Sequence, residues 1–241
     1  MLSIQIYTIR EHTKTYEDAL NALKKLKDLG YNSVQLAGNI EKLEFTARAA
    51  KEVGLEVIGV LSNLVTVEGN TDKLFEIMRF SGATDIGISA DEVGDDAVEM
   101  IKRANAFCKI ANENGFTFSY HNHSHEFIRG ESGKRAIDYI VESFDGDLMP
   151  DTYWLQHGGV DVIKFIEDNA KKIKILHLKD MQRTVDGVTF SELGKGNMNM
   201  KGIIEKAKEL GISNLVVEQD VCQGDSLLSA EISINYLKGV M

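Results

Sequence analysis

Short runs of apolar and β-branched residues alternate with longer segments whose apolar residues recur every three or four positions, from one end of the chain to the other. The short runs are typical of β-strands and the longer segments of amphipathic helices. The expected strands cover residues 2–7, 33–37, 55–60, 84–89, a run that begins at Phe116, 147–152, 173–178 and 214–218. The expected helices cover residues 16–29, 40–53, 71–81, 95–114, 133–144, 160–169, 200–210 and 226–237.

Five of the expected helices are followed by a glycine, which readily adopts the left-handed conformation that ends a helix before the next strand. These glycines are Gly30, Gly54, Gly82, Gly115 and Gly211. Strands that alternate with helices pair in parallel, because the helices act as crossovers.

Eight such units in 241 residues match a closed, parallel eight-stranded (β/α)8 TIM barrel, whose usual length is about 250 residues. An open doubly wound sheet is the alternative, but no G-x-G-x-x-G or P-loop motif follows any expected strand. The chain has no evident linker or low-complexity tract and only one proline, Pro150. The sequence therefore predicts one α/β barrel domain over residues 1–241.

The charge balance narrows the range of partners. A net charge of −10 argues against a nucleic-acid partner, because phosphate binding depends largely on Lys and Arg. No apolar run is long enough for a membrane span, and the N-terminus lacks the features of a signal peptide. Cys108 and Cys222 have no metal-binding or disulfide-framework spacing. We expect a cytoplasmic protein. Whether it forms a homo-oligomer stays open.

Imidazole and carboxylate groups collect where the last four expected strands end. In an α/β barrel these ends meet at one rim, where active sites lie. Neighbouring strands are about 4.8 Å apart, so inward-facing groups on all four can reach one ion. The imidazole and carboxylate residues are His121, His123, Glu126, Asp151, His177, Asp180, Glu218 and Asp220. Trp154 and Lys179 lie beside them in the sequence.

Histidines and carboxylates together suit one divalent ion such as Mn²⁺, Mg²⁺, Co²⁺ or Zn²⁺. Asp151, His177 and Glu218 are the expected ligands. The ligand from the fifth strand stays open between His121, which stands on the strand, and Glu126, which lies in the following loop. An isolated Asp after a strand, such as Asp151, is more often an N-cap or turn residue than a ligand, and His177 alone could be a hydrogen-bonded histidine at the rim. Their coincidence on successive strands favours a metal site.

Several motifs also resemble the xylose isomerase-like barrel superfamily, and within it the sugar phosphate isomerase/epimerase branch near the inosose dehydratases and keto-sugar epimerases. The motifs are Tyr120-His-Asn-His-Ser-His-Glu-Phe127, Asp151-Thr-Tyr-Trp154 followed by Gly158-Gly-Val-Asp161, His177-Leu-Lys-Asp180, Gly194-Lys-Gly-Asn-Met198 and Val216-Val-Glu-Gln-Asp220.

The resemblance implies a divalent metal at the rim, with Asp151, His177 and Glu218 at the family's ligand positions. His121 stands where most epimerases of the family have a glutamate, and Gln35 stands where many relatives have one. The resemblance also implies substrate contacts from Trp154, Gln35 and Tyr7, and an oxyanion or carboxylate contact from Lys179 beside the metal.

The expected chemistry is an isomerisation or epimerisation of a small keto-sugar or polyol-derived ketone. A metal that chelates a carbonyl and its neighbouring hydroxyl lowers the pKa of the α C–H, and a base then forms a metal-bound enediolate. Glu218, His123 or Glu126 can serve as that base, and Lys179 can stabilise the oxyanion. Loss of a β-hydroxyl would instead give an inosose dehydratase-like lyase.

Two further classes stay open, an abasic-site endonuclease-type hydrolase and a non-catalytic sugar-binding barrel. The acidic balance and the small number of rim histidines count against the hydrolase. The segment 181–199 is expected to be a long loop, long enough to act as a lid. Gly194-Lys-Gly196 within it is either a phosphate cradle or a flexible turn.

Overall fold

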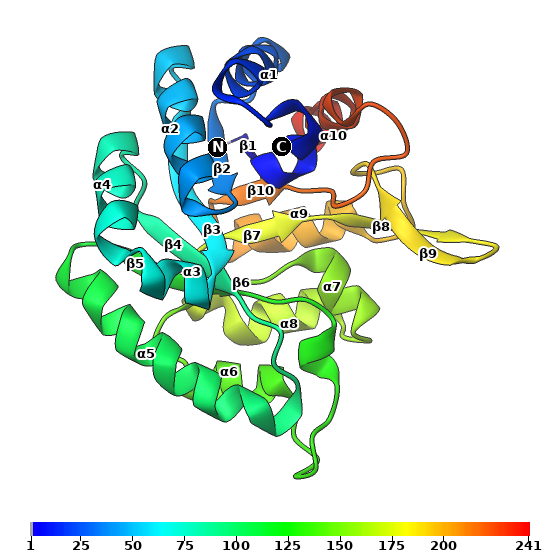
Figure 1. Cartoon of the computed structure of the whole chain (residues 1–241). Coiled ribbons are helices and arrows are strands. Elements are labelled where there is room, and N and C mark those ends of the chain that lie inside the picture. The colour runs from blue at the N-terminus through cyan, green and yellow to red at the C-terminus, as the bar shows by residue number, and fades with distance from the viewer. Residues whose placement is uncertain (1) are drawn as a thin grey trace.

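The computed structural model describes residues 2–241 and has the predicted α/β barrel (Figure 1). Eight parallel strands follow one another in the order β6-β5-β4-β3-β2-β1-β10-β7. Only isolated bridges, Leu148 to Ile173 and Asp151 to His177, join β6 to β7, so the barrel is nearly closed. The strands are β1 (Ser3–Gln5), β2 (Ser33–Ala37), β3 (Glu56–Asn63), β4 (Asp85–Ser89), β5 (Thr117–His121), β6 (Asp147–Met149), β7 (Leu176–Leu178) and β10 (Leu215–Val217).

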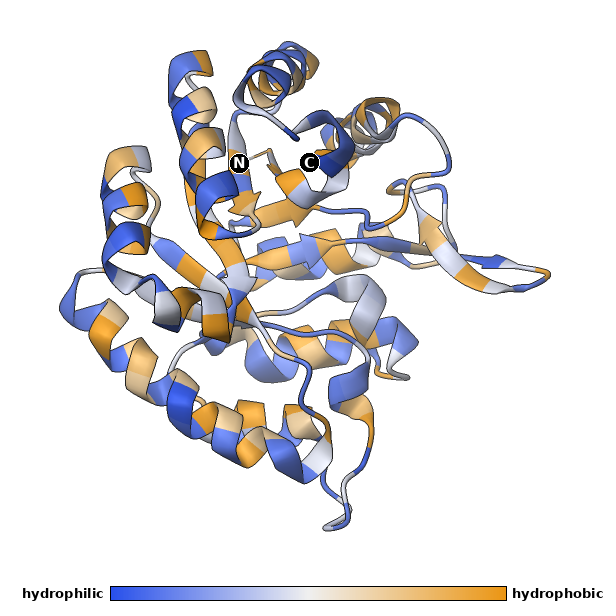
Figure 2. Ribbon diagram, in the orientation of Figure 1, coloured by the Kyte–Doolittle hydropathy of each residue, from blue (hydrophilic) through white to orange (hydrophobic). Residues whose placement is uncertain are grey.

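The helices surround the strands and bury one face against them. In Figure 2, polar and apolar residues alternate along the outer helices, as a period of about 3.6 residues requires. The helices are α1 (Tyr16–Leu29), α2 (Ile40–Val53), α3 (Leu64–Gly69), α4 (Thr71–Ser81), α5 (Ala97–Glu113), α6 (Ala136–Ser143), α7 (Thr152–His157), α8 (Val162–Asn169), α9 (Met200–Glu209) and α10 (Ser226–Val240). Short 3₁₀ turns are η1 (Ile6–His12), η2 (Gly94–Asp96), η3 (His125–Phe127) and η4 (Ala170–Lys172). No helix of residues 2–241 is both long and apolar enough to span a membrane.

The predicted helix ends are confirmed by the backbone. All five glycines that were expected to end helices have a positive φ, between 74° at Gly54 and 101° at Gly30. At the other end of α1, Thr15 and Asp18 form a reciprocal capping box, which satisfies two backbone donors. Each of these connecting helices therefore ends at a defined residue, so the strand that follows it also begins at a defined place.

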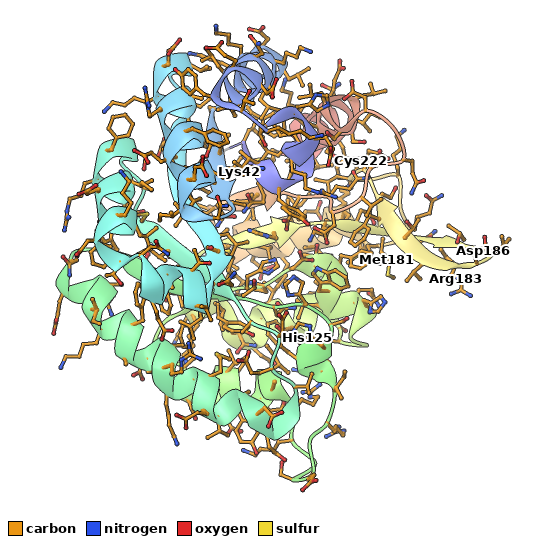
Figure 3. The ribbon with its side chains drawn as sticks, in the orientation of Figure 1. Lys42, His125, Met181, Arg183, Asp186 and Cys222 are labelled. Carbon is orange, nitrogen blue, oxygen red and sulfur yellow. The ribbon has the colours of Figure 1, made fainter. Side chains whose placement is uncertain are left out.

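Several expected elements differ from the structure in their bounds, and two of the differences affect the rim of the barrel. The segment 181–199 is not a long loop, because β8 (Asp180–Thr184) and β9 (Gly187–Ser191) form an antiparallel hairpin within it. The hairpin projects from the barrel, as the side chains of Met181, Arg183 and Asp186 show (Figure 3). The sixth strand stops at Met149, earlier than expected, because the next residues turn so that Asp151 can cap α7.

Candidate metal centre and active site

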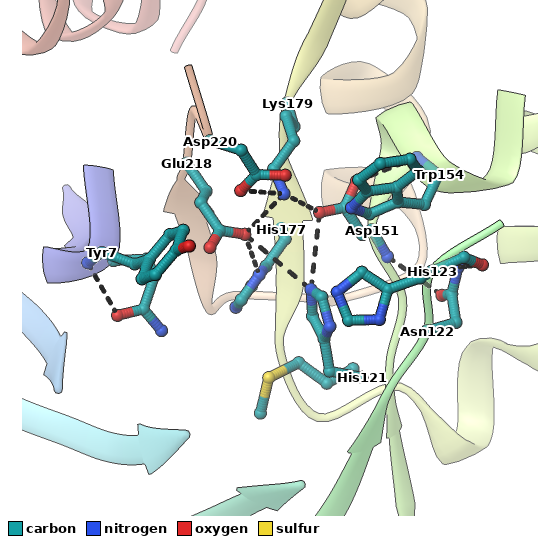
Figure 4. Close-up of polar contacts among 12 residues, drawn as sticks. Tyr7, His121, Asn122, His123, Asp151, Trp154, His177, Lys179, Glu218 and Asp220 are labelled. Atoms are coloured by element: carbon teal, nitrogen blue, oxygen red, sulfur yellow. Dashed lines mark hydrogen bonds and ion pairs between the residues drawn. The ribbon is translucent and has the colours of Figure 1, made fainter. Parts of the chain in front are cut away.

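Four side chains from four strands meet at the C-terminal rim of the barrel. His121 ends β5, Asp151 follows β6, His177 lies in β7 and Glu218 follows β10. Each offers a ligand atom within 4.8 Å of the others, and all four residues are buried (Figure 4). The geometry is therefore that of a possible four-ligand ion site, assembled from the group of residues that the strand ends predict.

Asp151 uses its two carboxylate oxygens for different purposes. Its Oδ1 accepts a hydrogen bond from the Trp154 backbone N–H at 3.1 Å, the N-cap bond of α7. Its Oδ2 lies 3.4 Å from Nε2 of His121. The Asn122 side chain accepts from the Asp151 backbone N–H, which ties this residue to the end of β5. The N-cap bond thus holds the Asp151 carboxylate so that its second oxygen points toward the other three residues of the site.

The imidazole of His177 meets a polar partner at each ring nitrogen. Its Nε2 lies 2.7 Å from Oε1 of Gln35, an acceptor that also receives a hydrogen bond from Gln5. With the proton on Nε2, the Nδ1 lone pair faces Oε2 of Glu218 at 2.8 Å. Burial lowers the pKa of His177, which favours this neutral form. Nδ1 is then free to act as a metal ligand beside Glu218, and a ligating histidine usually donates its other N–H in this way.

His121 supplies a second sign that a positive partner belongs here. Both of its ring nitrogens are buried and have no hydrogen-bond partner among the described residues. Burial acts to lower the pKa of His121, but the carboxylates of Asp151 and Glu218, 3.4 and 3.8 Å away, outweigh it and raise the pKa to about 9. Buried polar atoms without partners are rare in native proteins, so the donor set fits a bound divalent ion.

Lys179 already provides one positive charge at this rim. Its Nζ lies 2.7 Å from Asp151 Oδ2 and 3.0 Å from both Glu218 Oε2 and Asp220 Oδ1. Burial opposes the charge on Lys179, but these carboxylates raise its pKa. The ammonium also lowers the pKa of Glu218, against the effect of burial. An ion bound by Asp151 and Glu218 would therefore share their oxygens with an ammonium.

The group lies below an open cavity of about 650 Å³, a size that suits a small organic ligand. Two aromatic residues, Trp154 and Phe190, line it near Lys179. The remaining lining residues are Tyr7, Ala37, Gly38, Asn39, Leu61, Ser62, Asn63, Thr66, Ser89, His121, His123, Glu218 and Asp220.

Glu126 lies in a second group with His123 and His125, apart from the four-residue group. Its oxygens accept hydrogen bonds from the Tyr120 hydroxyl at 3.1 Å and the His123 backbone N–H at 2.9 Å. His125 binds the Ala90 carbonyl at 2.8 Å through its Nε2. His123 lines the cavity, and burial, followed by the charges of His121 and Lys179, lowers its pKa to about 3. Glu126 therefore organises the loop after β5 and does not face the cavity.

Of the three residues expected to contact the substrate, two line the cavity and one does not. Tyr7 and Trp154 both line the cavity. Gln35 does not, because its side chain is buried against Gln5, Met149 and His177. In this structure Gln35 positions His177.

The Gly194–Gly196 turn already holds an anion, and the anion is part of the chain. Oδ2 of the buried Asp180 accepts from the backbone N–H groups of Gly194 and Gly196 at 2.9 and 3.2 Å. Its Oδ1 accepts from Met181 and Met198 at 2.8 and 3.2 Å. The turn is therefore neither an open phosphate cradle nor a free loop, because Asp180 fills it.

Sequence reasoning missed Phe190, Asn39 and Asn63 as cavity residues. Phe190 lies on β9, and Asp186-Gly187 between two alternating runs is a typical hairpin signal that would have indicated this strand. Asn39 and Asn63 cap α2 and α3, a role that many asparagines have, so no signal set them apart.

The fold and the site define a class of protein, namely an α/β barrel with a buried His/Asp/Glu group at its C-terminal rim. The chain belongs to the xylose isomerase-like TIM barrel family, whose model matches residues 32–238. No curated protein matches it by sequence.

Three solved structures illustrate the likeness. A sugar phosphate isomerase/epimerase from Parabacteroides distasonis ATCC 8503 has a TM-score of 0.80 and 20% identity, with 98% of this chain and 93% of that chain covered. A D-allulose 3-epimerase from Methylomonas sp. has a TM-score of 0.79 and 9% identity, with 100% and 97% covered. A xylose isomerase-like TIM barrel protein from Mycobacterium smegmatis, in complex with magnesium, has a TM-score of 0.74 and 16% identity, with 99% and 95% covered. At these identities the likeness establishes the shared fold.

Proposed function

We propose that the chain is a divalent-metal-dependent isomerase or epimerase of a small keto-sugar or polyol-derived ketone. The observation that carries this proposal is the convergence of His121, Asp151, His177 and Glu218, whose ligand atoms lie within 4.8 Å of one another beside an open cavity that His121 and Glu218 line. Family membership, and the epimerases and isomerases among proteins of this fold, support the same reading.

The ion would be held by His121, Asp151, His177 and Glu218. When bound, it supplies a Lewis acid that polarises a carbonyl and acidifies the neighbouring C–H. We leave Glu126 out of this ligand set because its oxygens are engaged with Tyr120 and His123.

The chain's own residues would move the proton. Glu218 lines the cavity and is kept ionised by Lys179, so its carboxylate can accept a proton from the α carbon. His123, neutral and also in the cavity lining, is the second candidate base. The Lys179 ammonium would stabilise negative charge on the substrate oxygen. Trp154 and Phe190 would cover the apolar face of the sugar and exclude water.

The test is deuterium exchange into ketones in D2O, read by NMR, with the metal content of the same preparation measured. We expect one ion per chain, exchange at the α carbon, and a loss of roughly 10²-fold or more in Glu218→Gln, because general-base catalysis contributes that much. Glu231→Gln, an exposed exchange of the same kind on α10, is the control and should leave the rate unchanged.

The outcomes separate the reaction classes. Exchange that yields an isomer of the ketone, heavier only by the deuterium taken up, supports isomerisation or epimerisation, whereas loss of water would identify a lyase. Exchange retained in a folded Glu218→Gln protein would remove Glu218 as the base. No exchange with any ketone would defeat the proposal and favour a binding protein or a hydrolase.

A further inference from the structure

The part of the cavity lining contributed by the first half of the barrel is polar but uncharged. Five hydrogen-bonding residues on β3, β4, α3 and the turn after β2 form it, and we call this set the neutral wall: Asn39, Ser62, Asn63, Thr66 and Ser89. The acidic and basic groups in the cavity lining lie on the later strands, with Lys179, Glu218 and Asp220. The two ends of a ligand would therefore meet different chemistry.

Hydrogen bonds within the neutral wall fix what it can offer. Oδ1 of Asn39 accepts from the Lys42 backbone N–H at 3.0 Å, and Oδ1 of Asn63 accepts from the Thr66 backbone N–H at 2.8 Å. Because both amide oxygens cap helices, both NH₂ groups are left, and neither donates to another described residue. Two neutral donors, held by helix caps, suit the oxygens of sugar hydroxyl groups.

No Lys or Arg of the described cavity lining is free of a carboxylate partner. Lys179 is the only Lys or Arg in the described lining, and its ammonium already contacts Asp151, Glu218 and Asp220. Arg10 stacks on the ring of Tyr7, 4.3 Å from its centroid, donates to the Tyr7 carbonyl and lines a separate cavity of about 170 Å³.

Lys42 also stays outside the lining. Its side-chain carbons lie against Gly38, and it is not among the residues that line the cavity. A phosphate group at the neutral wall, away from the proposed ion, would thus be desolvated without a free Lys or Arg in the described lining to pair with it, which is unfavourable.

We infer that the ligand of this cavity is an uncharged polyhydroxy ketone, and that the neutral wall selects against phosphorylated sugars. The inference rests on the proposed function for the orientation of the ligand, with the carbonyl toward His121, His177 and Glu218 and the remaining hydroxyl groups toward Asn39 and Asn63.

Binding can be measured without turnover, because Trp154 is the chain's single tryptophan and lines the cavity. The metal-loaded full chain is titrated with D-fructose, D-tagatose and an inosose, and with the terminal phosphate esters of the two ketohexoses, while Trp154 fluorescence is followed. We expect a saturable change with at least one neutral ketone, and binding of its ester at least about tenfold weaker. An ester that binds as tightly as the free sugar, or no binding of any neutral probe, would overturn the inference.

A matched pair of variants tests the neutral wall itself. Asn63→Ser keeps an N-cap side chain for α3 but removes the amide donor, so ketone binding should weaken by about three- to tenfold, the value of one neutral hydrogen bond. Asn199→Ser makes the same change at the N-cap of α9, outside the cavity, and should bind ketone like the unaltered chain. Equal affinity of the two variants would remove Asn63 from recognition.

The deuterium-exchange assay keeps the two proposals distinguishable. Preferential binding of neutral ketones without exchange would leave the inference in place and defeat the isomerase. Exchange with a phosphate ester alone would support the isomerase and overturn the inference.

Discussion

Single side chains at the rim combine a structural and a chemical role. Asp151 caps α7 with one oxygen and faces His121 with the other, and Gln35 accepts from Gln5 and contacts His177 with the same oxygen. In each case the structural bond fixes the direction of the group that faces the site. Such preorganisation reduces the reorganisation needed when a cation or substrate enters.

His121 should tune which metal binds. A site with two imidazoles favours borderline ions such as Zn²⁺, Co²⁺ or Mn²⁺, whereas Mg²⁺ prefers oxygen ligands. We expect His121→Glu to shift the affinity ratio toward Mg²⁺ by at least about tenfold relative to Zn²⁺. Calorimetric titration of metal-free protein with each ion measures the ratio. An unchanged ratio in a folded variant would place His121 outside the ligand set.

Asp85, at the start of β4, predicts a pH dependence of stability that is independent of the site. Its Oδ1 accepts from Thr117 and Ser119 at 2.6 and 2.7 Å, while its buried Oδ2 has no partner. Burial raises the pKa of Asp85. The folded state therefore holds this proton more tightly than the unfolded state, and the free energy of unfolding falls as pH rises above about 3.9, until the folded pKa is passed.

Asp85→Asn removes this titration, so the decline should be shallower in urea unfolding followed from about pH 4 to about pH 8. Asp186→Asn at the tip of the hairpin is the control and should keep the original slope. Identical slopes for the unaltered chain and Asp85→Asn would show that Asp85 ionises as readily when folded as when unfolded.

At the scale of elements, the β8–β9 hairpin carries one side of the cavity. Phe190 stacks on Tyr153 with ring centroids 4.2 Å apart and also contacts Trp154. The turn after the hairpin is held by Asp180, which accepts four backbone hydrogen bonds. The position of Phe190 therefore depends on a carboxylate buried at the root of the hairpin.

Gly196 is required for that arrangement. A Cβ at this position would overlap the Asp180 carboxylate and the Met181 carbonyl, neither of which can move freely. We expect Gly196→Ala to lower the free energy of unfolding by about 1–3 kcal/mol and to change Trp154 fluorescence, since the hairpin must shift. Gly224→Ala, where a Cβ meets nothing within 4 Å, should change neither. Thermal unfolding and emission spectra compare the two, and a silent Gly196→Ala would contradict this account of the hairpin.

The elements also show how far the sequence could lead. The eight strands and most helices follow from periodicity and glycine ends, and strand order then brings His121, Asp151, His177 and Glu218 to one rim. The function of Gln35 and the engagement of Glu126 could not be predicted, because they depend on side-chain partners distant in sequence or on the fold of a loop. The filling of the glycine turn by Asp180 depends on such contacts too.

For the whole molecule, the gap between β6 and β7 is the least continuous part of the barrel. Isolated bridges cross it, together with two contacts close to the rim: the Thr152 hydroxyl donates to the Lys179 carbonyl and accepts from the Lys179 N–H, and the Lys179 ammonium pairs with Asp151. The four candidate ligands come from β5, β6, β7 and β10, on both sides of this gap. An ion there would join strands that the backbone ladder leaves apart.

Metal should therefore stabilise the entire barrel. A free ion concentration of about 100 times the Kd adds about 2.7 kcal/mol to the folded state, which raises Tm by about 5–10 °C for a chain of this length. Calorimetry of chelator-treated protein, with and without added Mn²⁺ or Zn²⁺, measures the shift. His177→Ala should abolish it, because the variant loses a ligand, whereas His157→Ala, exposed on α7, should retain it. If both variants respond alike, the ion binds elsewhere and the rim group is held together by Lys179 alone.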